Sequence, residues 1–219
     1  MSKSVYELKN DNYYRNSRKD LIDKVDIKND GKVLDVGCGT GVNLGYVKGK
    51  YPSCFTVGIE PYADVSEEYS IDRLHHCSAE KFLDIQTDKD FDVVMCLDSL
   101  EHMWDYQTIL AKLADIVKDD GVLLISVPNI SNFRTFYNVF IQKDFPKSKD
   151  GIFDETHCRW FTKKVLKADL LHIGFGNIEF SYTGLEKGKF LYYLDLITFG
   201  SLRDYIGFQI VAVARRLAC

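Results

Sequence analysis

The sequence predicts a single α/β domain, built on a mainly parallel sheet with helices on both faces. Three observations predict this fold class: short β-rich runs alternate with helix-like segments, one run is continuously apolar, and the first runs straight into a glycine-rich turn. The composition, 46% hydrophobic and 27% charged with four prolines, is that of an ordinary globular protein. A chain of 219 residues can bury one substantial core, so we expect residues 1–219 to form one domain.

The predicted strands are runs rich in β-branched and aromatic residues, bounded by turn residues. They are Lys32–Val36, Phe55–Ile59, Phe91–Leu97, Gly121–Val127, Asn177–Tyr182 and Phe208–Ala214. Every residue of Val93–Leu97 is apolar, as in a strand buried on both faces, which places this run near the centre of the sheet. After it, Ile109, Leu113 and Ile116 recur at helical spacing and predict a crossover helix.

Two segments fall outside this alternation. Tyr13–Val25 interleaves charged and apolar residues and predicts an amphipathic helix, so we expect residues 1–30 to form a helical lid. Residues 129–160 are rich in aromatic and polar side chains and follow a predicted strand. Such an insertion overhangs the carboxyl ends of the strands, where open α/β sheets bind ligands, so we assign it, with Tyr137, to substrate binding.

Charge and hydropathy exclude several classes of partner. The formal net charge of −4 gives no electrostatic footprint for a nucleic-acid binder. The start of the chain lacks an apolar signal core, and the stretch Phe190–Phe199 is short and contains Asp195. We therefore expect no membrane span and a cytoplasmic location. The six cysteines include no Cys-x-x-Cys pair, so a structural zinc site is not expected.

The most specific motif is Val33–Gly41, an apolar strand that enters a turn with the spacing Gly-x-Gly-x-Gly. Glycines there permit unusual dihedral angles and a close approach of the backbone to a ligand. The spacing differs from the Gly-x-Gly-x-x-Gly of dinucleotide sites, which argues against a nicotinamide dehydrogenase. Asp35, just before the turn, suits a ligand ammonium group better than a pyrophosphate.

With this motif the chain resembles the class I, Rossmann-like S-adenosylmethionine-dependent methyltransferases over about residues 30–180. The resemblance implies a seven-stranded sheet and S-adenosylmethionine as cofactor. It places the methionine part of the cofactor against the glycine loop, the ribose at the end of the second strand, and the adenine beyond it. The implied cofactor-binding residues are Asp35, Gly37, Cys38, Gly39, Gly41, Glu60, Pro61, Ala79, Glu80 and Asp98.

Methyl transfer from a sulfonium needs mainly alignment of the reacting atoms, and a base helps when the acceptor is a hydroxyl. His157 is our preferred general base because an imidazole titrates near neutral pH, and Asp98 is a second catalytic candidate. His102 and Arg159 are assigned to substrate binding, with Arg159 holding an anionic group. The alternative for His157 is a structural role that ties the insertion to the end of the strand.

A metal site is a further alternative. Asp98, Glu101, His102 and His157 resemble the metal ligands of small-RNA 2′-O-methyltransferases and of some quinone-biosynthesis O-methyltransferases. Two carboxylates and two imidazoles would suit an octahedral divalent ion. A Glu-His pair after the fourth strand also occurs widely in metal-free class I methyltransferases, so we favour a site without metal.

The acceptor is indicated only by diffuse resemblance. Ser126–Asn129, His157–Thr162 and an aromatic helix before Gln209–Arg215 are similar to segments of small methyltransferases associated with bacterial surface polysaccharides. This implies O-methylation of a small-molecule acceptor, such as a sugar, a nucleotide sugar or a glycan phosphate substituent. The alternatives are a metal-dependent RNA-terminal 2′-O-methyltransferase and a non-catalytic module that binds S-adenosylmethionine.

Overall fold

The computed structural model describes residues 17–85, 89–185 and 187–218. Its sheet has seven strands in the order β3-β2-β1-β4-β5-β7-β6. Strand β7 is antiparallel to both of its neighbours, and the remaining neighbouring pairs are parallel. The strands are β1 Lys32–Val36, β2 Phe55–Ile59, β3 Arg73–His75, β4 Phe91–Leu97, β5 Val117–Pro128, β6 Phe175–Tyr182 and β7 Gln209–Arg216. The predicted α/β class with a mainly parallel sheet is therefore confirmed.

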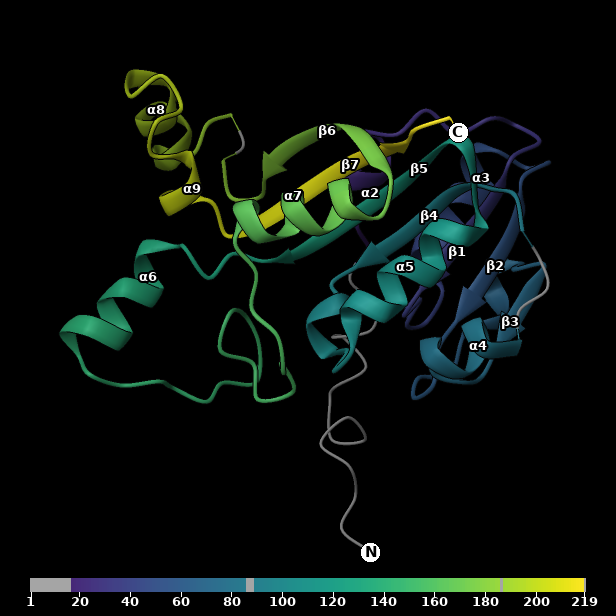
Figure 1. The fold of residues 1–219 in the computed structure, drawn as a ribbon, viewed down its shortest axis with the longest axis horizontal. Coiled ribbons are helices and arrows are strands. Elements are labelled where there is room, and N and C mark those ends of the chain that lie inside the picture. The colour runs from purple at the N-terminus through teal and green to yellow at the C-terminus, as the bar shows by residue number, and fades with distance from the viewer. Residues whose placement is uncertain (1–16, 86–88, 186, 219) are drawn as a thin grey trace, which may run out of the picture.

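Helices cover both faces of this sheet, and a group of short helices extends beyond its edge (Figure 1). The α-helices are α2 Lys19–Ile22, α3 Val42–Lys50, α4 Ala79–Ile85, α5 Tyr106–Ile116, α6 Phe133–Phe136, α7 Lys163–His172, α8 Phe190–Ile197 and α9 Arg203–Ile206. Single turns of 3-10 helix are η2 Glu67–Tyr69 and η3 Leu100–His102, and η4 Tyr137–Ile141 is a π-helix. In the described part of the chain, no helix is long and apolar enough to cross a membrane.

Successive side chains along the strands point to opposite faces of the sheet and belong to two buried apolar clusters, one on each face. Leu34 of β1 belongs to the cluster that holds the apolar faces of α4, α5 and α7. Its neighbour Val33 belongs to the cluster that includes α2 and α3. In β4, residues 91–97 are buried with the partial exception of Asp92, as expected for a central strand. The core is therefore a three-layer sandwich.

The helix predicted near the N-terminus is confirmed in part. Of residues 17–25, which the structure describes, Lys19–Ile22 alone are helical, and residues 13–16 lie outside the described residues. Beyond this turn, Val25 and Ile27 are buried while Asp26 between them is exposed, which is the period of an extended chain. The need to bury these two side chains ends the helix early. Whether residues 1–30 act as a lid stays a prediction.

The insertion after β5 divides into two parts. Its first part, α6 and η4, extends away from the sheet and carries exposed aromatic side chains (Figure 1). These are Phe133, Phe136, Tyr137 and Phe140. Its second part returns to the end of β4, where residues 149–157 contribute to a cavity. Only this second part lies where the sequence placed the whole insertion.

Candidate active site

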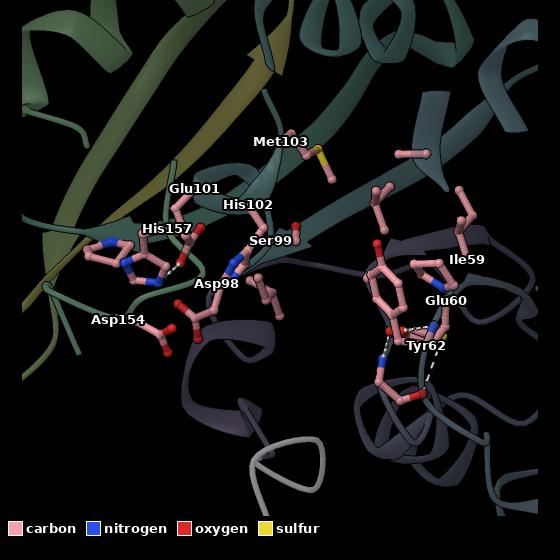
Figure 2. Close-up of a pocket in the computed structure, with 18 of the residues that line it drawn as sticks. Ile59, Glu60, Tyr62, Asp98, Ser99, Glu101, His102, Met103, Asp154 and His157 are labelled. Atoms are coloured by element: carbon pink, nitrogen blue, oxygen red, sulfur yellow. Dashed lines mark hydrogen bonds and ion pairs between the residues drawn. The ribbon is translucent and has the colours of Figure 1, made fainter. Parts of the chain in front are cut away.

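A cavity of about 1070 Å³ opens at the carboxyl ends of the parallel strands. The β1–α3 loop, the ends of β2 and β4, and the second part of the insertion contribute its walls. Figure 2 shows Glu60 and Tyr62 at one end of the cavity and Glu101, His157 and Asp154 at the other. The cavity thus joins the glycine motif to the candidate base, although the two are more than a hundred residues apart in sequence.

The glycine loop forms part of the wall with its backbone. Gly37 has φ +79° and Gly39 has φ +55°, in the left-handed region where glycine is favoured. A Cβ on Gly37 would lie 2.9 Å from the Cβ of Ser99, so this glycine also lets the loop approach the end of β4. Gly41 (φ +88°) precedes α3 outside the cavity wall, where a Cβ would lie 2.6 Å from Cδ1 of Ile71. Gly41 therefore allows the loop to pack against Ile71 on the side that faces away from the cavity.

Asp35 lies beneath this loop with 1% of its surface exposed and is not part of the cavity wall. Burial raises the pKa of this carboxyl to about 7; the side-chain amide of Asn43 opposes the rise and the charge of Glu60 adds to it. Asp35 is therefore poised to change its charge near neutral pH. A cation bound at the loop would favour its ionised form.

Glu60 connects the ends of β1 and β2. Its Oε2 accepts a hydrogen bond of 2.9 Å from the backbone N–H of Gly39. Its Oε1 accepts the N–H groups of Tyr62 and Ala63 at 2.8 and 3.1 Å. A carboxylate has about four lone-pair positions, so Glu60 keeps capacity to accept a ligand hydroxyl. Pro61 and Cys38 beside it, and Ala79 and Glu80 at the start of α4, also line the cavity.

Asp98 follows β4 with φ +55° and lies in the cavity wall. Its Oδ1 accepts hydrogen bonds from Ser126 Oγ at 2.9 Å and Gln209 Nε2 at 2.6 Å, and its Oδ2 pairs with the guanidinium of Arg18. Desolvation raises the pKa of Asp98, while Arg18 and the hydrogen bond from Ser126 lower it. This network fixes the Asp98 carboxylate.

Arg18, Ser126 and Gln209 were not among the predicted site residues. Arg18 reaches the site because its backbone N–H donates to the side chain of Asn43 in α3 at 2.9 Å. Gln209 and Ser126 lie on the neighbouring strands β7 and β5, close to the ends that face the cavity. Ser126 interrupts one apolar run and Gln209 directly precedes another, which is the signal that could have revealed them.

Glu101, His102 and His157 form a compact group at the far end of the cavity. One ligand atom from each lies within 4.8 Å of the other two. Because a carbonyl only accepts hydrogen bonds, Nδ1 of His157 donates to Ile152 O and Nδ1 of His102 donates to Thr156 O, each at 3.2 Å. In the neutral histidines Nε2 is then the ring nitrogen that carries no hydrogen, and His157 Nε2 lies 3.9 Å from Oε1 of Glu101.

Burial dominates the electrostatics of this group. The side chains of Glu101 and His157 are 1% and 5% exposed. Burial raises the pKa of Glu101 well above its usual value, and the charge of Asp98 raises it further. Oε2 of Glu101 has no hydrogen-bond partner among the described residues. A buried polar atom of this kind is costly, which is typical of a site built for a proton, a cation or a ligand.

Backbone hydrogen bonds hold the insertion against the end of β4. The N–H groups of Cys158 and Arg159 both donate to the carbonyl of Glu101, at 2.9 and 3.1 Å. Asp154 is buried and accepts from the N–H and hydroxyl of Thr156 at 2.9 and 2.7 Å, which shapes the turn before His157. Local turn chemistry and two long-range bonds therefore bring His157 to Glu101.

Two residues assigned to substrate binding lie elsewhere. Tyr137 is about half exposed on η4, in the part of the insertion that extends away from the sheet. The guanidinium of Arg159 stacks on the ring of Trp104 at 4.3 Å and donates to the carbonyls of Cys158 and Trp104. Neither side chain lines the cavity. Asp98 likewise stands apart from the three-residue group, because its carboxylate is held by Arg18, Ser126 and Gln209.

Comparison with known proteins agrees with this geometry. A family model described as "Methyltransferase domain" matches residues 6–179. The chain belongs to the methyltransferase domain family. Its mostly parallel seven-stranded sheet, with the glycine loop after β1, is the fold of the class I S-adenosylmethionine-dependent methyltransferases. The fold expected from the resemblance is therefore confirmed.

Members with known names use different acceptors. (S)-tetrahydroprotoberberine N-methyltransferase of Eschscholzia californica is 26% identical over 163 residues, covering 67% of this chain and 45% of that protein. A ubiquinone biosynthesis O-methyltransferase of Aromatoleum aromaticum is 31% identical over 112 residues, covering 48% of this chain and 47% of that protein. The chain thus spans about half the length of the curated relatives it matches.

A solved structure shares the fold over most of the chain. The 1,6-didemethyltoxoflavin-N1-methyltransferase of Burkholderia thailandensis, in complex with 1,6-didemethyltoxoflavin and S-adenosylhomocysteine, superposes with a TM-score of 0.55 at 16% identity. The match covers 86% of this chain and 72% of that one. At this identity the likeness concerns the fold.

Proposed function

We propose that this protein transfers the methyl group of S-adenosylmethionine to an oxygen of a small polar acceptor, such as a sugar, a nucleotide sugar or a glycan phosphate substituent. The observation that carries the proposal is the buried His157–Glu101 pair, which opens into the same cavity as the glycine loop. A cofactor site and a candidate base facing one space are the two parts that methylation of a hydroxyl needs.

The residues of the glycine-loop end fit the cofactor. Gly37 and Gly39 offer backbone without side chains, and Asp35 beneath them suits an ammonium group. Glu60 retains capacity to accept from a ribose hydroxyl. The fold neighbour from Burkholderia thailandensis, solved with S-adenosylhomocysteine, supports the same assignment. When bound, the cofactor supplies an activated methyl group on a sulfonium.

At the other end, His157 acts on the acceptor. Its Nδ1–H is committed to the Ile152 carbonyl, so Nε2 is positioned to take the proton of an acceptor hydroxyl as the oxygen attacks the methyl carbon. The imidazolium formed there is stabilised by Glu101 when that carboxyl is ionised, at 3.9 Å. The protein otherwise aligns the acceptor oxygen, the methyl group and the sulfur, because the sulfonium is already a good leaving group.

A polar acceptor is favoured by the chemistry of the cavity wall. The insertion contributes charged residues at the acceptor end, namely Lys149, Asp150, Asp154 and Glu155. A flat aromatic acceptor would be held better by the aromatic side chains of the insertion, but those lie outside the cavity. Carboxylates suit an acceptor with several hydroxyls, and the ammonium of Lys149 suits a phosphate.

The second candidate is a metal-dependent O-methyltransferase, including one that acts on an RNA terminus. It is favoured by the three ligand atoms of Glu101, His102 and His157 within 4.8 Å of one another. The Nδ1–H groups of His102 and His157 donate hydrogen bonds to backbone carbonyls, as is usual for histidines that bind metal through Nε2. The ion would lower the pKa of a bound hydroxyl. The net charge of −4 argues against RNA.

Calorimetric titration with S-adenosylhomocysteine, with and without EDTA and alongside metal analysis, tests both candidates. The metal-free proposal expects binding that EDTA leaves unchanged, with no stoichiometric metal. Metal that is lost in Glu101→Ala would favour the second candidate. Absence of binding in both conditions would contradict both.

The base is tested with His157→Ala. We expect cofactor binding to be preserved and turnover on the accepted sugar to fall by about 10²- to 10⁴-fold. His172→Ala, on the exposed end of α7, is the matched control and should keep full activity. Turnover equal to wild type in His157→Ala would remove His157 as the base, and binding without turnover on any acceptor pool would indicate the non-catalytic alternative.

A further inference from the structure

Helix α8 has the reverse of the pattern expected for a helix in water. Its one charged residue, Asp195, is buried and pairs with Arg203 of α9 through three hydrogen bonds of 2.7 to 3.2 Å. Its apolar residues face outward: Phe190 is 79% exposed and Ile197 73%, and Phe199 just beyond the helix is 97% exposed. A helix that buries its charge and exposes its apolar side is suited to an apolar surrounding.

The first part of the insertion also exposes aromatic side chains. On α6 and η4, Phe136 and Phe140 stack at 5.4 Å between ring centroids, and both are more than half exposed. The two segments are joined at their bases, because the side-chain amides of Asn129 and Asn132 donate to the Gly207 carbonyl after α9 at 3.0 and 2.8 Å. Both segments extend beyond the same edge of the sheet (Figure 1).

The charge around these aromatic side chains differs from that of the whole chain. Residues 133–149 contain Arg134, Lys143, Lys147 and Lys149 against the single acidic residue Asp144, which is a formal charge of +3. The chain as a whole carries −4. Lys187 and Lys189 precede α8 and are exposed. Exposed aromatic and aliphatic side chains bordered by cations are typical of surfaces that lie in the interface of an anionic membrane.

We propose that α6–η4 and α8–α9 together form a membrane-docking surface that binds bilayers with anionic phospholipid headgroups. The charge favours this occupant over a second copy of the chain. Two copies that met through this surface would bring their lysines together, whereas a layer of lipid phosphates complements them.

Docking in this way would set the mouth of the cavity close to the headgroups. Lys149 belongs both to the cationic border and to the cavity wall, and the chain continues from it along the wall to His157. An acceptor anchored in the lipid surface would then reach the base from the membrane side. This last step rests on the proposed function, whereas docking itself does not.

The test is co-sedimentation of the full-length protein with vesicles of phosphatidylcholine alone or mixed with phosphatidylglycerol. We expect binding to the mixed vesicles, with weaker binding at high salt and on pure phosphatidylcholine. Phe136→Ser with Phe140→Ser, and Ile197→Ser with Phe199→Ser, should each weaken the partition about tenfold or more, because each pair removes two apolar side chains from the interface. Lys143→Glu with Lys147→Glu should remove the preference for the anionic lipid.

The matched control is Ile85→Ser, which changes an isoleucine that is 66% exposed at the end of α4, and it should bind like wild type. Unfolding temperature and S-adenosylhomocysteine titration, measured on every variant, separate loss of docking from loss of fold or of the proposed activity. Absence of binding to either vesicle would overturn the proposal. Self-association in sedimentation velocity that the same serine variants abolish would also overturn it, in favour of a second copy.

Discussion

Replacing Asp35 with asparagine tests the electrostatic cost of the acid buried beneath the glycine loop. Burial raises the pKa of this carboxyl from 3.8 to about 7. At 1.36 kcal/mol per unit, this rise corresponds to about 4 kcal/mol. The pKa of Asp35 is higher in the folded than in the unfolded protein. The contribution of Asp35 to the free energy of unfolding is therefore fully present below about pH 4 and is lost as the pH rises to about 7. Asparagine has nearly the same shape and does not ionise.

We therefore compare the free energy of unfolding of Asp35→Asn with that of the wild type. As the pH rises from about 4 to about 8, we expect the difference between them to change by about 4 kcal/mol in favour of the variant. Urea unfolding followed by circular dichroism measures this difference, and other titrating groups cancel because both proteins carry them. Asp115→Asn, on an exposed position of α5, is the control and should change by less than about 0.5 kcal/mol. A difference that stays constant across this pH range would refute the assignment of a strongly raised pKa.

The same substitution connects stability to ligand binding. If the ammonium group of the cofactor lies at the glycine loop, it favours ionised Asp35, and binding below about pH 7 releases a proton. The affinity for S-adenosylhomocysteine should then rise as the pH approaches 7 and level off above it. Calorimetry in buffers of different ionisation enthalpy measures the proton release. Proton release that persists unchanged in Asp35→Asn would assign it to another group.

Three further substitutions probe the cavity. Gly39→Arg should abolish S-adenosylhomocysteine binding in calorimetry, because a side chain at φ +55° is strained and projects from the loop; retained affinity would contradict a cofactor at the loop. Glu60→Ala should weaken that affinity about tenfold or more through the loss of a charge-assisted hydrogen bond, and unchanged affinity would displace the ribose assignment. Arg18→Met should lower the free energy of unfolding by about 2 kcal/mol at neutral pH, less than for a fully buried pair because Asp98 faces the cavity. The loss should shrink at acidic pH, where Asp98 is protonated, and a loss independent of pH would contradict the pairing.

The central strands could be predicted because their signals are local. β1, β2 and β4 have the predicted bounds, since each is a mainly apolar run that is followed by a polar residue or a glycine. Strand β3 was not among the predicted runs, because Arg73–His75 is short, partly exposed and gains its place only by pairing with β2. Strand β5 begins four residues before the predicted start, at Val117, which pairs with Phe91 at the beginning of β4.

The residues around Asp98 could not be found in the same way, because their roles depend on distant contacts. Asp98 pairs with Arg18, eighty positions earlier, and with Gln209, more than a hundred positions later. The sequence offered Asp98 as a partner of Glu101, His102 and His157 because all follow the same strand or the insertion. Its left-handed backbone and the three donors around it direct the carboxylate to Arg18 instead.

This difference between local and distant contacts divides the site into two halves that should respond differently to change. The cofactor half is built from consecutive residues at the ends of β1 and β2, and the hydrogen bond from Gly39 to Glu60 joins them. The acceptor half depends on the insertion, which is held to the end of β4 by two hydrogen bonds to the Glu101 carbonyl. Substitutions in the second part of the insertion, at residues 149–155, can therefore alter which acceptor enters while leaving the glycine loop intact. The acceptor is best sought by varying the insertion while cofactor affinity is held as the control.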